Sequence, residues 1–487
     1  MSRILLASLI LSLSVPALGE SPIGPDEAVE IALRQNPSLA AAVANLERAS
    51  WAVIGEDAFF SPTLRLDVGA NHSETPAFRN GQIDRTGIDQ LQVGSTLSHR
   101  LRLGTDLALR LEHNQRWEDG REDLSLFAIG PVYDTSARLE LTQPFWRGSG
   151  RKVVEAALRQ ARGAEAEALR SAERAASQLV RDVLVAWWEL WYAEEALRIE
   201  EEALRLAERQ RDETRRRVGL GTAAPVSVLT FETRVAEREE GVANALRQRQ
   251  ERALALAAQL GDLSLSISAG PPSLPLVPLP EQESVRKMAA ERAPEVREAE
   301  ASLDLASLRA EVLADPFRPR LDVQGFAEVG GLSSVYAGFG GRDRFAWTAG
   351  VNLVFELPLN GNLHRAAAAQ ASLSVREADR RLAQARLGAE AEADAERARY
   401  ESAKARVELA RKTLEVAEAQ LVAEERKYEI GTSTPIEVLQ AEEAVRSARL
   451  RLARAEVDLR NAETAIEHLT GGLVQRWVEP VLDRSRP

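Results

Sequence analysis

The chain has 487 residues, no cysteine and an aromatic content of only 5%. The lack of cysteine excludes disulfide bonds, thiolate metal sites and thiol nucleophiles. Its 62 basic and 74 acidic residues give a net charge of −12, and they are interspersed, so the chain lacks the clustered basic face that nucleic-acid binding requires. Ala, Glu, Arg and Leu dominate long stretches, which is typical of long helices and coiled coils.

The first residues have the pattern of a secretory signal peptide. A basic start at residues 1–3 precedes an apolar stretch at residues 4–15, and residues 17–19 place small side chains where a signal peptidase reads. We predict a signal peptide of residues 1–19. The alternative is an N-terminal membrane anchor, but the stretch is shorter than the about 20 apolar residues of a spanning helix. Elsewhere the sequence predicts no transmembrane helix, so any contact with a membrane must be made by strands.

The mature chain repeats itself. Matching positions are Pro37 and Pro294, Pro62 and Pro319 (each 257 apart), Pro144 and Pro358 (214 apart), and Gly221 and Gly431 (210 apart). Such self-similarity indicates a duplicated structural unit. We predict a first repeat at residues 20–269, a Pro-rich linker at 270–280, a second repeat at 281–472 and a C-terminal tail at 473–487.

Each repeat is predicted to begin with two short helices, at residues 25–35 and 38–57 in the first and at 281–291 and 295–313 in the second. Alternating apolar and polar residues follow, with the period of two that is typical of strands. The alternating segments are 62–70, 91–97, 107–111, 139–145, 321–329 and 345–355. These alternating positions mark strands of roughly ten residues each, the length that a tilted strand needs to cross a bilayer.

The links between these strands differ in length. Those at residues 73–90, 117–133 and 330–344 are long, polar and rich in glycine, whereas the link at 102–105 is tight. This asymmetry is typical of outer-membrane barrels. Aromatic residues at the short-turn side could form an interfacial girdle: Phe59, Phe60, Phe145, Trp146 and Phe317. A soluble sandwich with one wet face is the alternative, because alternation alone does not distinguish water from lipid.

Six strands are too few to close a membrane barrel, since the smallest use about eight. Open sheet edges in lipid would leave backbone groups unpaired, so copies must combine if the strands lie in a membrane. The strand region of the first repeat is longer by 43 residues, which is 257 minus 214. That is enough for an extra pair of strands near residues 91–111. Whether this pair joins the barrel wall, giving six strands per chain and not four, is left open by the sequence.

Each repeat ends in a pair of long helices. Between Gly150 and Gly219 only isolated glycines interrupt the helical pattern, which predicts one helix of nearly seventy residues, about 100 Å long. Its partner is predicted at residues 225–260, and the second repeat carries the same pair at 362–430 and 435–469. Apolar residues along the first helix mark a coiled-coil seam. Four aromatic residues midway are expected to pack where shorter helices form a belt: Trp187, Trp188, Trp191 and Tyr192.

The turns that join the long helices match each other. The first carries Gly219, Leu220, Gly221 and Thr222 before Pro225, and the second carries Gly431 and Thr432 before Pro435. Glycine caps the ending helix and proline opens the next one. Turn chemistry alone explains one such tip, but two matched tips predict a surface that contacts a partner.

The order of these elements resembles the TolC-like outer membrane efflux proteins, from about residue 25 to residue 472. The segments that carry the resemblance are 143–148, which leads into a helix, and 428–432 followed by 436–439. The resemblance implies a mixed fold, in which a homotrimeric membrane β-barrel is continued by an α-helical coiled-coil tunnel through the periplasm. It implies the outer membrane of a Gram-negative bacterium as the location.

The resemblance also implies the function and the partners. The chain is expected to be the exit duct of a tripartite export system, fed by an inner-membrane pump and contacted at its tips by a periplasmic adaptor. Outer-membrane lipid surrounds the barrel in this family, and neither a cofactor nor a nucleic acid is expected.

A gate at the periplasmic end is implied as well. Tyr428 corresponds to the gate tyrosine of the family, the aspartate partner of that tyrosine falls at Ser227, and Ser433 replaces a basic residue. Glu437 and Gln440 match two positions of acidic rings, the second without its charge. We expect neutral hydrogen bonds, each worth roughly half a charge-assisted one, to hold the gate, and mild cation selectivity at Glu437. The alternative for Glu437 is a first-turn acid stabilised by the helix dipole.

The sequence contains no constellation that predicts catalysis or metal binding. The histidines do not recur at the spacing of metal ligands: His72, His99, His113, His364 and His468. We therefore predict that the chain is not an enzyme. The alternatives to an efflux duct are a non-transporting secreted or surface coiled-coil scaffold and, among channels, a type I protein secretion duct. The exported cargo, the pump class, the adaptor and the resting state of the gate do not follow from the sequence.

Overall fold

A computed structural model describes residues 21–79, 82–119, 131–221, 224–271, 280–313, 318–333, 345–357, 359, 361–430 and 432–482. The chain divides into two compact units. Unit 1 comprises Met1–Asn45, Leu169–Ala299 and Leu382–Pro487, and unit 2 comprises Leu46–Ala168 and Glu300–Arg381. Each unit therefore contains segments of both predicted repeats. The predicted signal peptide and most of the Pro-rich linker lie outside the described residues.

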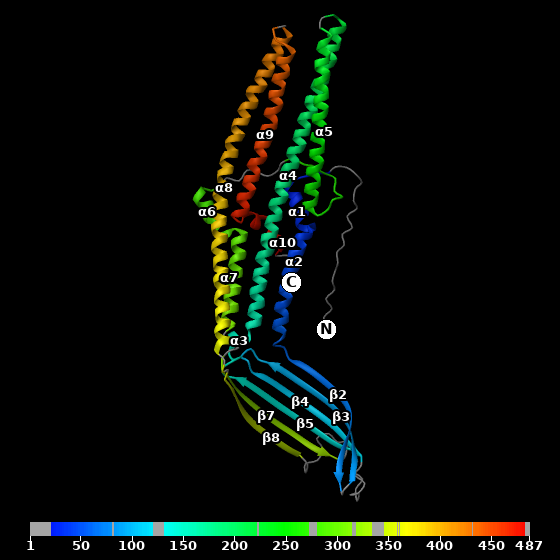
Figure 1. Ribbon diagram of the computed structural model, residues 1–487, viewed down its shortest axis with the longest axis vertical. Coiled ribbons are helices and arrows are strands. Elements are labelled where there is room, and N and C mark those ends of the chain that lie inside the picture. Colours follow the sequence, from blue (N-terminus) through cyan, green and yellow to red (C-terminus); the bar gives the residue numbers. More distant parts are fainter. Residues whose placement is uncertain are drawn as a thin grey trace. The chain divides into compact units, whose positions relative to one another are not determined.

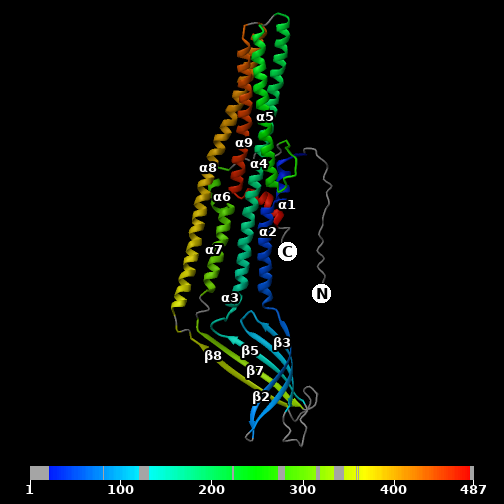
Figure 2. The same ribbon diagram turned by 45° about the vertical axis from the view of Figure 1, so that its right-hand side comes forward.

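Unit 2 is built on a six-stranded antiparallel sheet (Figures 1 and 2). In spatial order its strands are β2 (Thr63–Arg79), β3 (Gln82–Arg100), β4 (Asp106–Asp119), β5 (Val132–Pro144), β7 (Arg320–Ser333) and β8 (Phe345–Glu356). The pair β3–β4, which the sequence left open, belongs to this sheet, which has six strands among the described residues. Among the described residues, β2 and β8 have a neighbouring strand on one side only.

The strands are longer than the sequence patterns predicted, and one predicted loop is wrong. β2 and β3 pair residue by residue as far as Arg79 and Gln82, so the polar stretch at residues 73–90 is a continued hairpin. At the start of this stretch one polar contact crosses the two strands, since His72 Nδ1 lies 2.7 Å from Asp89 Oδ1. Pro76 lies in β2, an edge strand, where a missing N–H is tolerated. The other two predicted loops are at 117–133 and 330–344. Most of each, at 120–130 and 334–344, lies outside the described residues.

The tight turn after β3 was predicted correctly. Leu101 N donates to Thr105 O at 2.8 Å, and Gly104 has a φ of 96°. A Cβ at position 104 would lie 2.7 Å from Gly148 O, so the turn requires glycine for its conformation and for its close packing.

The aromatic residues near this turn differ in exposure. Phe59, Phe145 and Trp146 are exposed, as an interfacial girdle requires. Phe60 is buried, and the Arg102 guanidinium lies over its ring, 5.1 Å from the centroid. The assignment of Phe60 to an exposed girdle is therefore wrong, because its ring packs inside unit 2. Phe317 lies outside the described residues.

The helical part of unit 2 comes from α2 (Pro37–Ala58), α3 (Arg151–Val154), α7 (Pro294–Val312) and the first turns of α4 (Ala156–Gly219) and α8 (Gly361–Glu429). The long helix predicted to follow Gly150 is interrupted at Glu155. The Glu155 carboxylate accepts hydrogen bonds from Arg102 Nη1 at 2.9 Å and from Arg151 Nε at 3.0 Å. These two charge-assisted bonds anchor the residue at which the chain departs from helical geometry.

Unit 1 contains the remaining length of α4 and α8, their partners α5 (Val226–Leu260) and α9 (Pro435–Leu469), and short helices. α4 lies beside α5, and α8 lies beside α9 (Figures 1 and 2). The short elements are α1 (Pro25–Gln35), α6 (Gln282–Arg292), a π-helix η4 (Val474–Val478) and α10 (Glu479–Leu482). Two short parallel strands that the sequence analysis missed, β1 (Ser21–Ile23) and β6 (Ile267–Ala269), also belong to this unit.

The main core of unit 1 surrounds Trp187, which is fully buried. Side chains from α1, α5, α9 and η4 pack in the same cluster, including Val29, Leu256, Val457 and Val478. Trp187 Nε1 donates to Ile23 O at 2.8 Å, so the polar end of the indole is satisfied within the core. The prediction that this aromatic cluster has a packing role is thus confirmed. Within the described ranges, no helix combines the length and the hydropathy that crossing a membrane requires.

Candidate functional site

The first matched tip lies between α4 and α5. The Gly221 φ of 73° is left-handed, and its N–H donates to Val218 O at 2.9 Å, which is the glycine cap that the sequence predicted. Leu220 is exposed. Pro225 precedes α5 without a side-chain cap, and Thr222 lies outside the described residues.

The second tip, between α8 and α9, is closed by a different set of contacts. Thr432 N donates to Lys427 O at 2.8 Å, whereas Gly431 lies outside the described residues. Thr434 caps α9 in a capping box with Glu437, and Pro435 occupies the first turn. The reciprocal bonds of a capping box satisfy backbone donors at the start of the helix. The helix after the second tip, α9, therefore begins with a side-chain cap, and the helix after the first tip, α5, does not.

Glu437 faces this cap. Its Oε2 accepts from Thr434 N at 2.7 Å and lies 2.8 Å from Ser433 Oγ. The backbone hydrogen bond from Thr434, followed by the hydroxyl of Ser433, lowers the pKa of the Glu437 carboxyl. The first-turn alternative from the sequence analysis is therefore realised within the chain, and the exposed carboxylate still carries the charge that an acidic ring would need.

Tyr428 contacts α4 through an arginine. Arg217 Nη1 lies 3.4 Å from the Tyr428 hydroxyl, and the guanidinium carbon lies 5.4 Å from the ring centroid. The Ser433 hydroxyl donates a hydrogen bond to Glu424 Oε1, with 2.5 Å between the two oxygens. Both contacts have a charged partner, which differs from the neutral hydrogen bonds expected at Ser227 and Ser433. At 3.4 Å, however, the bond to Tyr428 is at the weak end of the hydrogen-bond range.

Two of the predicted gate residues, Tyr428 and Gln440, line different hollows. Tyr428 and Pro435 line a hollow of about 310 Å³ together with Arg217 and Phe231. Gln440 lines a separate open groove of about 500 Å³ between α5 and α9. Ser227 lies in the first turn of α5, where its N–H donates to Ala224 O at 3.0 Å. The roles of these residues in gating remain predictions.

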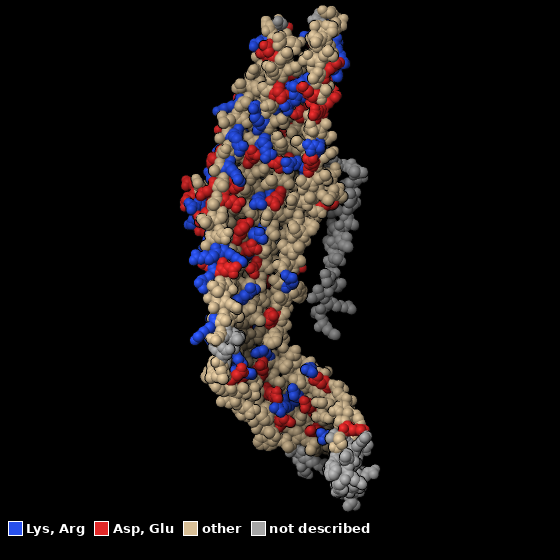
Figure 3. Space-filling view, in the orientation of Figure 1, with Lys and Arg blue, Asp and Glu red and all other residues tan. Residues whose placement is uncertain are grey.

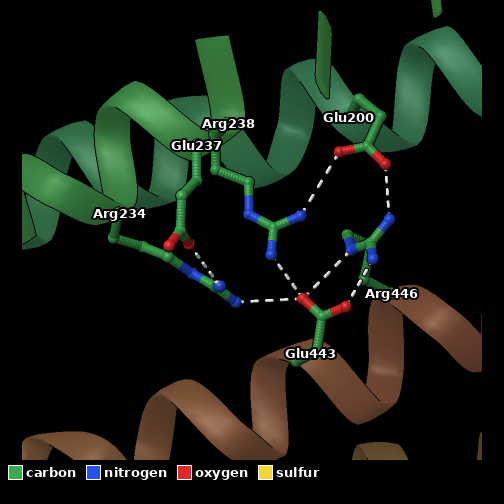
Figure 4. A network of polar contacts seen from close by, with 6 residues as sticks. All are labelled: Glu200, Arg234, Glu237, Arg238, Glu443 and Arg446. Atoms are coloured by element: carbon green, nitrogen blue, oxygen red, sulfur yellow. Dashed lines mark hydrogen bonds and ion pairs between the residues drawn. The ribbon is translucent and has the colours of Figure 1, made fainter. Parts of the chain in front are cut away.

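The sequence analysis missed a group of charged residues that joins the two helical hairpins of unit 1. Figure 4 shows Glu200 of α4, Arg234, Glu237 and Arg238 of α5, and Glu443 and Arg446 of α9. Acidic and basic residues alternate all along these helices, and Figure 3 shows them interspersed over the surface. Charged residues that form ion pairs between helices and charged residues that face water occur in the same sequence pattern. The sequence therefore gave no signal that distinguished these six residues.

The sheet of unit 2 has two chemically distinct faces. Cross-strand register aligns one row of apolar residues across all six strands: Leu64, Leu97, Leu109, Leu139, Ala327 and Ala349. The adjacent row, on the opposite face, is polar throughout: Arg65, Thr96, Arg110, Arg138, Glu328 and Thr348. The large aliphatic side chains of the apolar row are exposed. On the polar face, Arg138 Nη1 donates to Glu328 Oε2 at 3.3 Å.

Residues 285–472 match the family model of the outer membrane efflux protein. Over this segment, which is less than half of the chain, the sequence is similar to that family. The matched segment covers most of the predicted second repeat, including both helices of its hairpin and the second tip. Efflux across the outer membrane of a Gram-negative bacterium is the function of the family, and its members extend into the periplasm. The family is a class of channels and not of enzymes.

Solved structures share the fold of this chain. The outer membrane protein VceC from Vibrio cholerae is 19% identical with a TM-score of 0.64, and the match covers 92% of this chain and 96% of VceC. The outer membrane channel CmeC of Campylobacter jejuni is 14% identical with a TM-score of 0.63, over 95% of this chain and 89% of CmeC. The open state of the MtrE channel of Neisseria gonorrhoeae is 20% identical with a TM-score of 0.60, over 92% and 89%. No curated protein matches the chain.

Proposed function

We propose that three copies of this efflux protein close their sheets into one barrel, and that the barrel is the outer-membrane part of an exit duct for a tripartite efflux system. The two-faced sheet carries this proposal. Its apolar row places exposed leucines where lipid requires them, and its polar row places charges where a water-filled lumen accepts them.

The open edges of the sheet support the assembly of several copies. β2 and β8 are the first and last strands of the sheet, and an unpaired strand edge in lipid costs several kcal/mol for each unsatisfied backbone group. If β8 of one copy pairs with β2 of the next, three copies of six strands give eighteen. That number exceeds the about eight strands of the smallest membrane barrels, and the family resemblance favours three copies.

The helical tips support a contact with a periplasmic adaptor, through which an inner-membrane pump delivers substrate. Several large apolar side chains near the tips are exposed: Leu220, Val226, Leu229, Ile430 and Ile436. Exposed apolar clusters of this kind mark interaction surfaces. We assign the adaptor contact to both tips. The described residues of this surface are Gly219, Leu220, Gly221 and Pro225 on the first tip and Thr432 and Pro435 on the second.

The experiment that tests the proposal combines native mass spectrometry in detergent with conductance in planar bilayers. We expect trimers that form ion-conducting pores. A chain that remains monomeric without detergent and leaves bilayers non-conducting would overturn the proposal and would favour a soluble scaffold. A photoreactive amino acid at position 220 should cross-link to a periplasmic protein in cells, whereas one at Leu263, an exposed site beyond the end of α5, should not.

A further inference from the structure

The outer strands of the six-stranded sheet, β2 and β8, have the least covered apolar side chains. Leu66 of β2 is 71% exposed and Val351 of β8 is 75% exposed. On the inner strands, Leu109 of β4 is 39% exposed and Leu141 of β5 is 40% exposed. Each inner strand has a neighbour on both sides, whereas β2 and β8 have one each in the part of the chain that the structure describes. The difference is the one that a missing neighbouring strand produces.

The strand ends on the short-turn side of the sheet are displaced in one direction. The aligned apolar row contains Leu64 of β2 and Ala349 of β8. β2 begins at Thr63, one residue from this row, and β8 ends at Glu356, seven residues from it. The strands between them end three, three, five and seven residues from the row. The sheet therefore shifts by six residues from β2 to β8, which is seven minus one, as strand ends do when tilted strands end at one level.

This shift limits how β8 of one copy can lie beside β2 of the next. Side chains must stay on their own face, so the register changes only in steps of two residues. For strands about 4.8 Å apart, shifts of six and eight residues per copy give strand tilts of about 35° and 43°. Shifts of four and ten give about 25° and 50°. Only six and eight agree with the tilt of about 35–45° in outer-membrane barrels.

The apolar face favours the shift of six. That shift places four apolar residues of β8 opposite four of β2, in the pairs Phe355–Leu64, Leu353–Leu66, Val351–Val68 and Ala349–Ala70. A shift of eight leaves three such pairs within the strands. It also places Ala349 opposite His72 and moves Leu64 past the end of β8. Because apolar cross-strand pairs stabilise a sheet, the shift of six is the better match.

The glycines of the polar face favour the same register. Phe326 of β7 lies over Gly350 of β8, since a Cβ at position 350 would be 2.6 Å from the Phe326 ring. A shift of six places Gly69 of the next copy opposite Gly350, and a Cβ at Gly69 would have open space around it. A shift of eight would bring the side chain of Asn71 to this position. The shift of six therefore leaves room beside the ring.

The charges at the sheet edges do not outweigh this preference. A shift of eight would place Arg65 opposite Glu356. Each of these residues already has a partner within its own chain, since Arg65 Nε donates to Asp67 Oδ1 at 2.8 Å and Arg147 Nη2 lies 2.8 Å from Glu356 Oε2. A new pairing of Arg65 with Glu356 would compete with these contacts, so it adds little.

We propose that β8 pairs with β2 of the next copy at a shift of six residues, with Val351 opposite Val68, and that this ladder closes an eighteen-stranded barrel. The ladder rests on the proposed trimeric duct and adds its exact partners and its width. Eighteen strands about 4.8 Å apart and tilted by about 35° give a circumference of about 105 Å and a diameter of about 34 Å between backbones. Barrels of 16–18 strands leave an aqueous channel, so the strand wall does not sort small-molecule cargo by size.

Disulfide cross-linking between copies tests the register, because the chain has no cysteine of its own. Val68→Cys with Val351→Cys tests the apolar face, and Asn71→Cys with Thr348→Cys tests the polar face. Both faces are used because close and wide residue pairs alternate along an antiparallel ladder. In the proposed register, the two cysteines of each variant lie directly opposite each other on neighbouring copies.

The matched controls move one cysteine by two residues. Ala70→Cys with Val351→Cys and Ser73→Cys with Thr348→Cys face each other only at a shift of eight. At a shift of six they are diagonal neighbours, about 7–8 Å apart, which is too far for the Cβ separation of about 3.5–4.5 Å in a disulfide. Each control therefore reports the competing register on the same face.

We expect covalent trimers on non-reducing gels from at least one of the two test variants, at a yield severalfold above that of its control. Higher yields from the controls would overturn the proposed register, as would trimers in native mass spectrometry that cross-link in none of the four variants. Both outcomes leave the trimeric duct standing. A chain that stays monomeric as wild type and in every variant would overturn the duct together with the ladder.

Discussion

The two units of this protein use the same kinds of side chain in opposite ways. In the sheet of unit 2, leucines and tryptophans are turned outward and charged residues pair on the other face. In unit 1, the largest apolar side chain is enclosed at the centre, and ion pairs join the outer parts of the helices. The comparison teaches that the apolar exposure of the sheet is not poor packing, because the same chain encloses a large apolar core in unit 1.

The sharpest way to break this comparison is to truncate one tryptophan in each unit. Trp187→Ala removes a fully buried indole and should destabilise the protein by about 3–5 kcal/mol. Trp347 is 73% exposed, so Trp347→Ala should leave the folded chain almost unchanged in detergent. Urea unfolding followed by circular dichroism measures both. Equal losses of stability would contradict the different environments of the two indoles.

A second test separates the faces of the sheet. Leu139→Arg places a charge in the apolar row of β5, and we expect a cost of about 2–4 kcal/mol for insertion if this row lies near the bilayer midplane. Ser136→Arg adds the same side chain to the same strand on the polar face, and its cross-strand neighbour is Glu112. Folding into vesicles, measured by protection from protease, should fail only for Leu139→Arg. Failure of both variants would show that the two faces do not differ in environment.

These contrasts explain which parts of the fold were predictable. The period of two and the long helical pattern located every strand of the large sheet and all four hairpin helices, because each pattern extends over many residues. The pair β3–β4 stayed undecided because strand number follows from pairing and not from alternation. The loop predicted at residues 73–90 was wrong. Polar composition and Pro76 indicate a loop, although an edge strand accepts both. β1 and β6, at three residues each, are too short to produce a pattern.

The candidate site was less predictable than the fold. The glycine cap at Gly221 and the first-turn position of Glu437 follow from local chemistry, which sequence carries directly. The Arg217 contact of Tyr428 and the group of charged residues around Glu443 depend on which faces of separate helices meet. In helices where more than one residue in four is charged, many registers would pair opposite charges equally well, so the actual partners became known only from the structure.

The two tips give a smaller test, within unit 1. Thr434→Ala removes the side-chain cap of α9 and should cost about 1 kcal/mol. Pro225, at the corresponding position before α5, contributes no such cap. Hydrogen exchange at the first turns of α5 and α9 is the measurement. We expect exchange at the start of α9 in Thr434→Ala to rise toward the rate at the start of α5, and equal protection before and after the change would contradict the assigned cap.

The smallest expected effect concerns ion selectivity at Glu437. Three carboxylates near the axis of a trimer would attract cations, so Glu437→Gln should reduce cation selectivity in planar bilayers. The hydrogen bond from Thr434 and the Ser433 hydroxyl lower the pKa of Glu437. A carboxyl with a lowered pKa stays charged as the pH falls past its ordinary value and loses its charge only below that point. The selectivity of the wild type should therefore persist from neutral pH to below the ordinary glutamate range. Selectivity that is unchanged in Glu437→Gln would leave the carboxylate with its capping role alone.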